Sequence, residues 1–294
     1  MVVAAISAMY VYKKRALQMK ESTLLMGKID YINASPVYYG LDNGLLPDWI
    51  EMVPNPPAIL NGMIQDGKIA MSPVSSAFYG MNHRELLILP DLSISSHGEV
   101  MSVILMSNHT LDELHGRKIM LTRESSTSAC LVKLIMAQKH MVPVYSTGKL
   151  KCLEDIPGDV DAAMIIGDAA MTQPWESRFK YRFDLGMVWH GATGLPFVYA
   201  LWVVQKKYAQ QHPDAVRAAL ELFHQSRSMG YDHIKQVISK GAQKLNLEEA
   251  YVERYFKGLI CDLDAPKIKG LTYFFDSLHR HGVFSEKVNL RFLE

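Results

Sequence analysis

Short apolar runs alternate with amphipathic stretches along the chain from Thr23 onward. The amphipathic stretches place apolar residues three and four positions apart, as a helix with one buried face requires. The strand-like runs lie at 23–32, 117–122 and 162–166, and the clearest helical stretches at 55–67 and 129–140. The stretch 85–96 is predicted to be a strand that runs into a serine-rich loop. Strands that alternate with helices in this way predict an α/β fold.

Two longer apolar strand candidates interrupt this alternation of short strands and helices: EVMSVILMS at 99–107 and LPFVYALWVV at 195–204. They bracket the block 108–194, and we expect them to carry the chain into a second lobe and back. Residues 23–100 and 205–294 are then the two parts of one lobe. The other lobe is predicted to span 101–204, including both crossing strands. Helical spacing dominates after 205, and these helices are expected to pack on the first lobe.

Composition narrows the class of protein. Of 294 residues, 49% are hydrophobic and 21% are charged, so the chain can bury a substantial core. The net charge of +1 comes without a basic stripe or an acidic tail, which argues against nucleic acid or an anionic membrane as a partner. The three cysteines are few, odd in number and far apart, which fits a reducing compartment and offers no disulfide framework.

The first 22 residues stand apart as an N-terminal extension. Twelve mainly apolar residues precede Lys13, Lys14 and Arg15, whereas a secretory signal carries its charge before the apolar stretch. The run is also shorter than the roughly 20 residues of a membrane span. We therefore expect a cytoplasmic protein; an anchoring role for this run would instead favour an extracytoplasmic binding protein.

Small polar clusters end four of the strands and open helices. A helix N-terminus offers unpaired N–H groups and about half a positive charge, so it can hold an anion without Arg or Lys. Each cluster alone is explained by helix capping, which contributes about 1 kcal/mol, but four together favour a pocket for a small anion where the strands end. The clusters are Asn33 to Ser35, Ser72 to Ser76, Ser125 to Ser128, and Gly167 with Asp168.

Individual residues in these clusters allow more than one interpretation. Ser35 and Pro36 suit a helix start, with the serine as its cap, but Asn33 has no part in that cap: it either faces a ligand or braces the turn. Asp168, directly after a glycine, is predicted to cap a helix rather than act as a base. Arg123 is a candidate partner for a substrate carboxylate. His97 is a candidate for the site or a plain loop residue.

No nucleotide-binding glycine motif, H-E-x-x-H or C-x-x-C occurs in the sequence. Several ordered strings nevertheless form a recognisable set: YINASPVYYGL (31–41), GKIAMSPVSS (67–76), LPDLSISSHGEVMSV (89–103), LTRESSTS (121–128), IGDAA (166–170) and WHGATGLPFVYALWVV (189–204). Together they resemble the chorismate dehydratase family of the futalosine route to menaquinone. The resemblance runs from about residue 27 to about residue 206.

The resemblance implies the two-lobed fold of type II periplasmic binding proteins, with mixed sheets flanked by helices and a ligand cleft between the lobes. It also implies a lyase that dehydrates chorismate to 3-[(1-carboxyvinyl)oxy]benzoate without metal or organic cofactor. The substrate's own enolpyruvyl carboxylate would act as the base. Partners other than this small molecule are not expected, and the chain would be a monomer or a homodimer.

The resemblance places the family's catalytic amide on Asn33 and its catalytic serine on Ser102. One departure is His97-Gly98-Glu99, where the family often has Asp-Gly-Pro. The predicted substrate-binding set is Ser35, Ser75, Ser76, Ser95, Ser96, Ser125, Ser126, Thr127, Ser128, Gly167, Asp168, Thr193 and Gly194.

Two alternatives stay open at this point. A non-catalytic solute-binding protein for a small aromatic or dicarboxylic anion would have the same fold, because function depends on the site rather than the scaffold. A sister enzyme acting on a later, larger intermediate of the same pathway would share it too. Asn33, Ser102 and the lack of a secretion signal favour the dehydratase.

Overall fold

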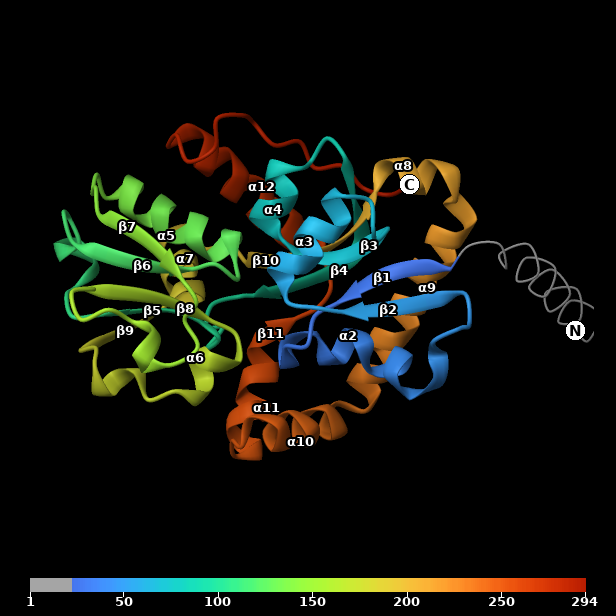
Figure 1. Ribbon diagram of the computed structural model, residues 1–294, viewed down its shortest axis with the longest axis horizontal. Helices are drawn as coiled ribbons and strands as arrows, with labels where there is room; N and C mark the ends of the chain where they lie inside the picture. The colour runs from blue at the N-terminus through green and yellow to red at the C-terminus, as the bar shows by residue number, and fades with distance from the viewer. Residues whose placement is uncertain (1–22) are drawn as a thin grey trace, which may run out of the picture.

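Two mixed β-sheets, each flanked by helices, form the two lobes of the computed structural model, which describes residues 23–294 (Figure 1). The larger sheet has the strand order β11-β4-β10-β3-β1-β2. Its strands are β1 (Leu24–Lys28), β2 (Ile50–Pro54), β3 (Met71–Ser75), β4 (Leu86–Ser96), β10 (Phe197–Gln205) and β11 (Leu259–Ile260). The extension predicted for residues 1–22 lies outside the described residues.

The smaller sheet has the order β7-β6-β8-β5-β9 and lies in the middle of the chain. Its strands are β5 (Val103–Ser107), β6 (Lys118–Thr122), β7 (Val144–Gly148), β8 (Ala162–Ile166) and β9 (Tyr181–Asp184). Each sheet contains a parallel group of three strands: β1 pairs with β2 and β3, and β6 pairs with β7 and β8. Strands β10 and β5 run antiparallel to their neighbours, which makes both sheets mixed.

Helices cover both faces of the larger sheet, with α2 and α9 on one side and α3, α4 and α12 on the other (Figure 1). The helices are α2 (Ser35–Gly40), α3 (Pro57–Gln65), α4 (Ser76–Met81), α5 (Ser126–Gln138), α6 (Asp168–Thr172), α7 (Leu185–Thr193), α8 (Lys206–Gln211), α9 (Pro213–Asp232), α10 (Ile234–Leu245), α11 (Glu249–Gly258) and α12 (Ala265–Arg280). Helices α5 to α7 flank the smaller sheet. After β10, α9 and α10 pack against α2, α11 contacts β11, and α12 packs on β10.

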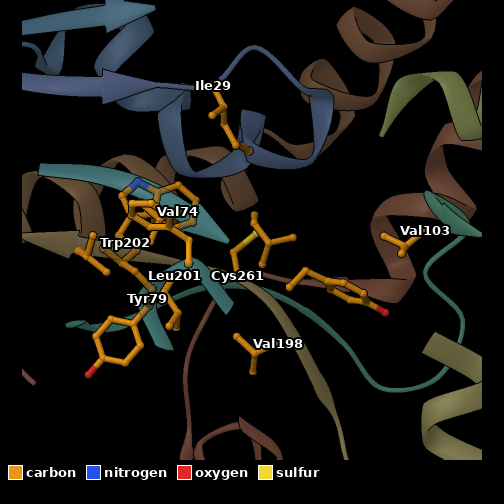
Figure 2. Close-up of a cluster of buried hydrophobic side chains, with 14 of the residues drawn as sticks. Ile29, Val74, Tyr79, Val103, Val198, Leu201, Trp202 and Cys261 are labelled. Atoms are coloured by element: carbon orange, nitrogen blue, oxygen red, sulfur yellow. The ribbon is translucent and has the colours of Figure 1, made fainter. Parts of the chain in front are cut away.

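Alternation along the strands explains why the smaller sheet is apolar on both faces. In β5, Val103 and Leu105 join the main core, whereas Ile104 and Met106 point into a second core with Trp175. Successive strand residues face opposite sides, so a strand covered on both sides is continuously apolar. In the larger lobe, Figure 2 shows Leu201 and Trp202 of β10 beside Val74 of β3.

The crossing strands differ from the prediction in extent and in place. Strand β5 begins at Val103, and residues 99–102 form a connecting segment in which Met101 has a positive φ of 60°. Strand β10 lies inside the larger sheet, between β3 and β4, so its assignment to the second lobe was wrong. Its apolar residues are needed to fill the centre of the larger core, which hydrophobicity alone does not reveal.

Two predicted caps are also corrected. The N-cap of α2 is Ala34, without a side-chain hydrogen bond, because a 3₁₀ turn at Ile32–Ala34 leads directly into the helix. The N-cap of α6 is Gly167, so Asp168 is the first helical residue and does not cap it. Across residues 23–294, the structure contains no helix that is both long and apolar enough to cross a membrane.

Candidate functional site

A cleft lies between the lobes, where parallel strands of both sheets end. It holds about 640 Å³ of space free of protein atoms, including solvent at its mouth, a size typical of small-molecule sites. Six of the predicted site residues line it: Asn33, Ser75, Ser102, Ser125, Ser128 and Gly167. The remaining lining is mainly apolar, with Tyr31, Glu124 and Tyr199 as further polar contributors.

Asn33 reaches the cleft from the 3₁₀ turn that follows β1. Its side-chain oxygen Oδ1 is buried and has no hydrogen-bond partner among the described residues. A buried acceptor without a partner costs roughly 1–3 kcal/mol, so proteins rarely retain one without a use. Asn33 Oδ1 is therefore available to a donor group of a ligand.

Ser102 lines the cleft from the segment that connects the lobes. The Asp184 carboxylate accepts hydrogen bonds from the backbone N–H groups of Val100 and Met101, the latter at 2.6 Å, and also caps α7. Burial raises the pKa of Asp184 despite these bonds. On the other side, the Tyr255 hydroxyl donates to Ser102 Oγ at 3.1 Å. Ser102 is thus fixed in both backbone and side chain.

The N-terminus of α5 opens into the cleft beside Ser125 and Ser128. Ser125 is the N-cap, and its Oγ accepts a hydrogen bond from the backbone N–H of Ser128 at 3.2 Å. No Lys or Arg lines the cleft within residues 23–294. The positive end of the α5 dipole and the serine hydroxyls are therefore its main means of holding an anion. Arg123 is exposed, and its guanidinium lies 3.5 Å from the Thr147 carbonyl oxygen rather than in the cleft.

Two hydrogen bonds join the lobes beside the cleft. The hydroxyls of Ser75 and Ser126 lie 2.7 Å apart, and Thr127 Oγ1 accepts from the backbone N–H of Ala77 at 2.8 Å. The second bond satisfies a free N–H in the first turn of α4 with a side chain from the other lobe. Ser126 and Thr127 therefore hold the lobes together and do not line the cavity.

A third contact between the lobes involves residues that the sequence did not single out. The Tyr31 hydroxyl donates to Glu124 Oε2 at 2.5 Å, and Lys151 Nζ lies 2.9 Å from Glu124 Oε1. Burial and the neighbouring Glu124 raise the pKa of Tyr31, which keeps its hydroxyl protonated. Tyr31 and Glu124 both lie within the strings that carry the family resemblance, but nothing in a single sequence indicated that they would be in contact.

Gly167 makes this contact possible because it faces the Tyr31 ring. A Cβ at this position would lie 3.1 Å from the ring, and the backbone has a φ of 65° and ψ of −147°, a region that essentially only glycine occupies. The adjacent Asp168 is largely buried at the same junction. Burial raises the pKa of its carboxyl, against the opposing effects of Lys244 and a hydrogen bond from the Ile32 backbone.

The other predicted substrate-binding residues lie outside the cavity lining, and their role in binding stays a prediction. Ser76, Ser95 and Ser96 are buried, and their hydroxyls donate to the backbone carbonyls of Val198, Ile260 and Gly98. Ser35 is in the first turn of α2. Thr193 and Gly194 form the end of α7, where the Thr193 hydroxyl donates to the Trp189 carbonyl. His97 packs edge-on against His190 rather than lining the cleft.

Comparison with known proteins places residues 24–280 in the family described as menaquinone biosynthesis. A chorismate dehydratase of Thermus thermophilus is 27% identical over 271 residues, covering 86% of this chain and 94% of the relative. A chorismate dehydratase of Campylobacter jejuni is 29% identical over 190 residues, covering 63% of this chain and 69% of the relative.

Solved structures confirm the predicted fold. A protein of Archaeoglobus fulgidus superposes with a TM-score of 0.69 at 15% identity, covering 89% of this chain and 98% of that one. The periplasmic aliphatic sulphonate binding protein of Escherichia coli superposes with a TM-score of 0.61 at 15% identity, covering 92% of this chain and 97% of that one. The fold is thus that of the periplasmic binding proteins, with the cleft between its lobes.

Proposed function

The chain belongs to the menaquinone biosynthesis family, and from that premise we propose that it is a lyase that dehydrates chorismate to 3-[(1-carboxyvinyl)oxy]benzoate. Two relatives that carry the name chorismate dehydratase support this choice of reaction. The observation that carries it is the unpaired, buried Oδ1 of Asn33 in the cleft between the lobes. We further propose that the protein acts in the cytoplasm, on the futalosine route.

The reaction requires little acid or base catalysis from the side chains of the protein. The bond between C4 and its hydroxyl oxygen breaks, the hydrogen on C3 leaves as a proton, and the electron pair of that C–H bond completes the aromatic ring. One water molecule is released for each chorismate. Because aromatisation drives the elimination, the protein needs mainly to orient the substrate, exclude water and stabilise developing charge.

The polar residues of the cleft suit these tasks. The amide of Asn33 and the hydroxyl of Ser102 are the proposed catalytic groups, positioned to hydrogen-bond the reacting part of the substrate. The N-terminus of α5, with Ser125 and Ser128, is the proposed site for a substrate carboxylate. The proton goes to the enolpyruvyl carboxylate of the substrate itself, and no side chain of the protein is proposed as the base for this step.

Among residues 23–294, Glu124 is the one carboxylate in the lining, and a doubly negative substrate would be repelled by an unpaired charge there. Its two oxygens are instead bound by the Tyr31 hydroxyl and the Lys151 ammonium. This pairing offsets the negative charge of Glu124. Because Tyr31 belongs to the other lobe, its part of the pairing depends on closure of the cleft. We propose that closure is what makes the site compatible with a dianion.

A non-catalytic binding protein is the second candidate, favoured by the shared fold of the sulphonate-binding proteins. The test is to incubate the purified full-length chain with chorismate, follow loss of the cyclohexadiene absorbance and weigh the product. The dehydratase gives repeated turnover to a product lighter by one water. Saturable binding of chorismate, with all of it recovered unchanged, would establish the binding protein instead.

A further inference from the structure

Tyr255 is a buried tyrosine that touches the proposed catalytic serine from outside the cleft. It lies on α11, which packs with the larger lobe, and its side chain is 2% exposed. Its hydroxyl oxygen lies 3.1 Å from Ser102 Oγ, and the geometry makes the tyrosine the donor. Tyr255 does not line the cavity, so it reaches the substrate site only through Ser102.

The direction of this bond determines what Ser102 can do. A serine hydroxyl has one hydrogen to donate and two lone pairs that accept. When Tyr255 occupies one lone pair, the hydrogen of Ser102 stays free and is directed away from the tyrosine. A hydroxyl that accepts one hydrogen bond also becomes a better donor, because the bonds of a chain polarise one another.

Tyr255 keeps its proton under ordinary conditions. Full burial raises the pKa of its hydroxyl, an effect that outweighs the hydrogen bond to Ser102. The tyrosine therefore acts as a fixed donor and does not take part in proton transfer.

Helix α11 also holds the connecting segment at a second point. Arg254, adjacent to Tyr255, contacts both carboxylate oxygens of Glu99 at 2.8 Å. Glu99 is part of the segment in which this chain departs from the usual family string. The residues 99 and 102 are thus both tied to one helix, which limits movement of Ser102 when the lobes shift.

We propose that Tyr255 is a positioning residue that orients the Ser102 hydroxyl toward the leaving hydroxyl of the substrate. This role rests on the proposed function, because it requires a reaction in which Ser102 donates. The donated hydrogen bond stabilises negative charge on the departing oxygen, and the proton that the enolpyruvyl carboxylate has taken from C3 passes to that oxygen to complete the released water.

The test is a double-mutant cycle on the full-length protein, with Tyr255→Phe, Ser102→Ala and the two combined. Tyr255→Phe keeps the ring and its packing but removes the donor, so we expect kcat to fall about tenfold with KM nearly unchanged, as for loss of one hydrogen bond between neutral groups. In the Ser102→Ala background the same change should cost less than about twofold, because the residue acts through Ser102.

Two further variants separate positioning from structural support. Tyr255→Met also lacks the donor and should show the same dependence on Ser102. Tyr251→Phe, one turn earlier on α11 and outside the cavity lining, should leave kcat unchanged. Melting temperatures of all variants are measured alongside the rates.

Equal losses of kcat in both backgrounds, or a loss confined to KM, would overturn the role of Tyr255 while leaving the dehydratase assignment intact. A wild-type protein that binds chorismate without turnover would remove the proposed function, and the role of Tyr255 with it. The two failures are distinguished by the wild-type rate alone.

Discussion

Replacing Asn33 by alanine should separate activity from stability. Its Oδ1 is buried without a partner in the ligand-free protein, whereas in catalysis the amide is proposed to bind the substrate. An amide that braced the turn would instead have its hydrogen bonds satisfied by the protein. The two roles therefore predict opposite effects of Asn33→Ala on folding.

The magnitudes follow from the burial of one oxygen. Removing an unpaired buried acceptor relieves about 1–3 kcal/mol, and the side chain faces the cleft, so its loss leaves no void in the core. The free energy of unfolding should stay constant or rise within that range, and the melting temperature by roughly 2–4 °C per kcal/mol. The value of kcat/KM should fall about 10²–10³-fold, as when one positioned hydrogen-bonding group is lost at a developing charge.

The assay pairs thermal unfolding of the ligand-free protein with initial rates on chorismate. Asn61 is the matched control: its Oδ1 is also buried without a partner, but it lies on α3 outside the cavity lining. Asn61→Ala should leave the rate unchanged. Should Asn33→Ala lower the stability by more than about 1 kcal/mol and keep full activity, the residue braces the turn and our reasoning about it is wrong.

Three further changes probe the junction between the lobes. Tyr31→Phe removes the donor to Glu124, so KM for chorismate should rise several-fold in steady-state assays while the melting temperature changes little; an unchanged KM would count against coupling of closure to this contact. Gly167→Ala forces a side chain against the Tyr31 ring in a backbone region that costs about 1–3 kcal/mol, and calorimetry should show a lower melting temperature, which an unaltered transition would contradict. For Asp168, burial raises the folded-state pKa, so its contribution to stability is present below the unfolded pKa and is lost as pH rises through the folded pKa. Asp168→Asn should therefore have a higher melting temperature than the wild type at pH about 7.5, and the difference should disappear near pH 4. A difference in melting temperature that persists near pH 4 would contradict the raised pKa of Asp168.

The predictable part of the fold was local. Strand β8 was predicted at its observed bounds and β6 within one residue, because continuous apolar runs report burial directly. Strand β4 continues to Ser96, where a serine-rich loop was predicted. The place of β10 could not be predicted in this way: its apolar residues fit either lobe, and the sheet in which it pairs is decided by contacts with β3 and β4, which are distant in sequence. The family resemblance, carried by whole strings, was confirmed by the family match.

The site was predictable at the ends of strands and less so elsewhere. Asn33 and Gly167 line the cleft because the polypeptide has just left a strand there, a geometry that sequence patterns reveal. Ser102 lines it from the segment that leads into β5, and only the family resemblance pointed to it. The serine clusters divide in a way that no pattern revealed, since Ser125 faces the cleft while Ser126 and Thr127 bind the other lobe. Tyr31 and Glu124 stand 93 positions apart, and only the folded chain brings them together.

Chorismate carrying deuterium at C3 tests the central claim most directly. Elimination across C3 and C4 removes that hydrogen, so mass spectrometry and NMR of the product should find an aromatic ring with an intact enolpyruvyl ether, one water lost and no deuterium retained. Retention of the label in the product, or recovery of the labelled chorismate unchanged after saturating binding to the protein, would contradict the account.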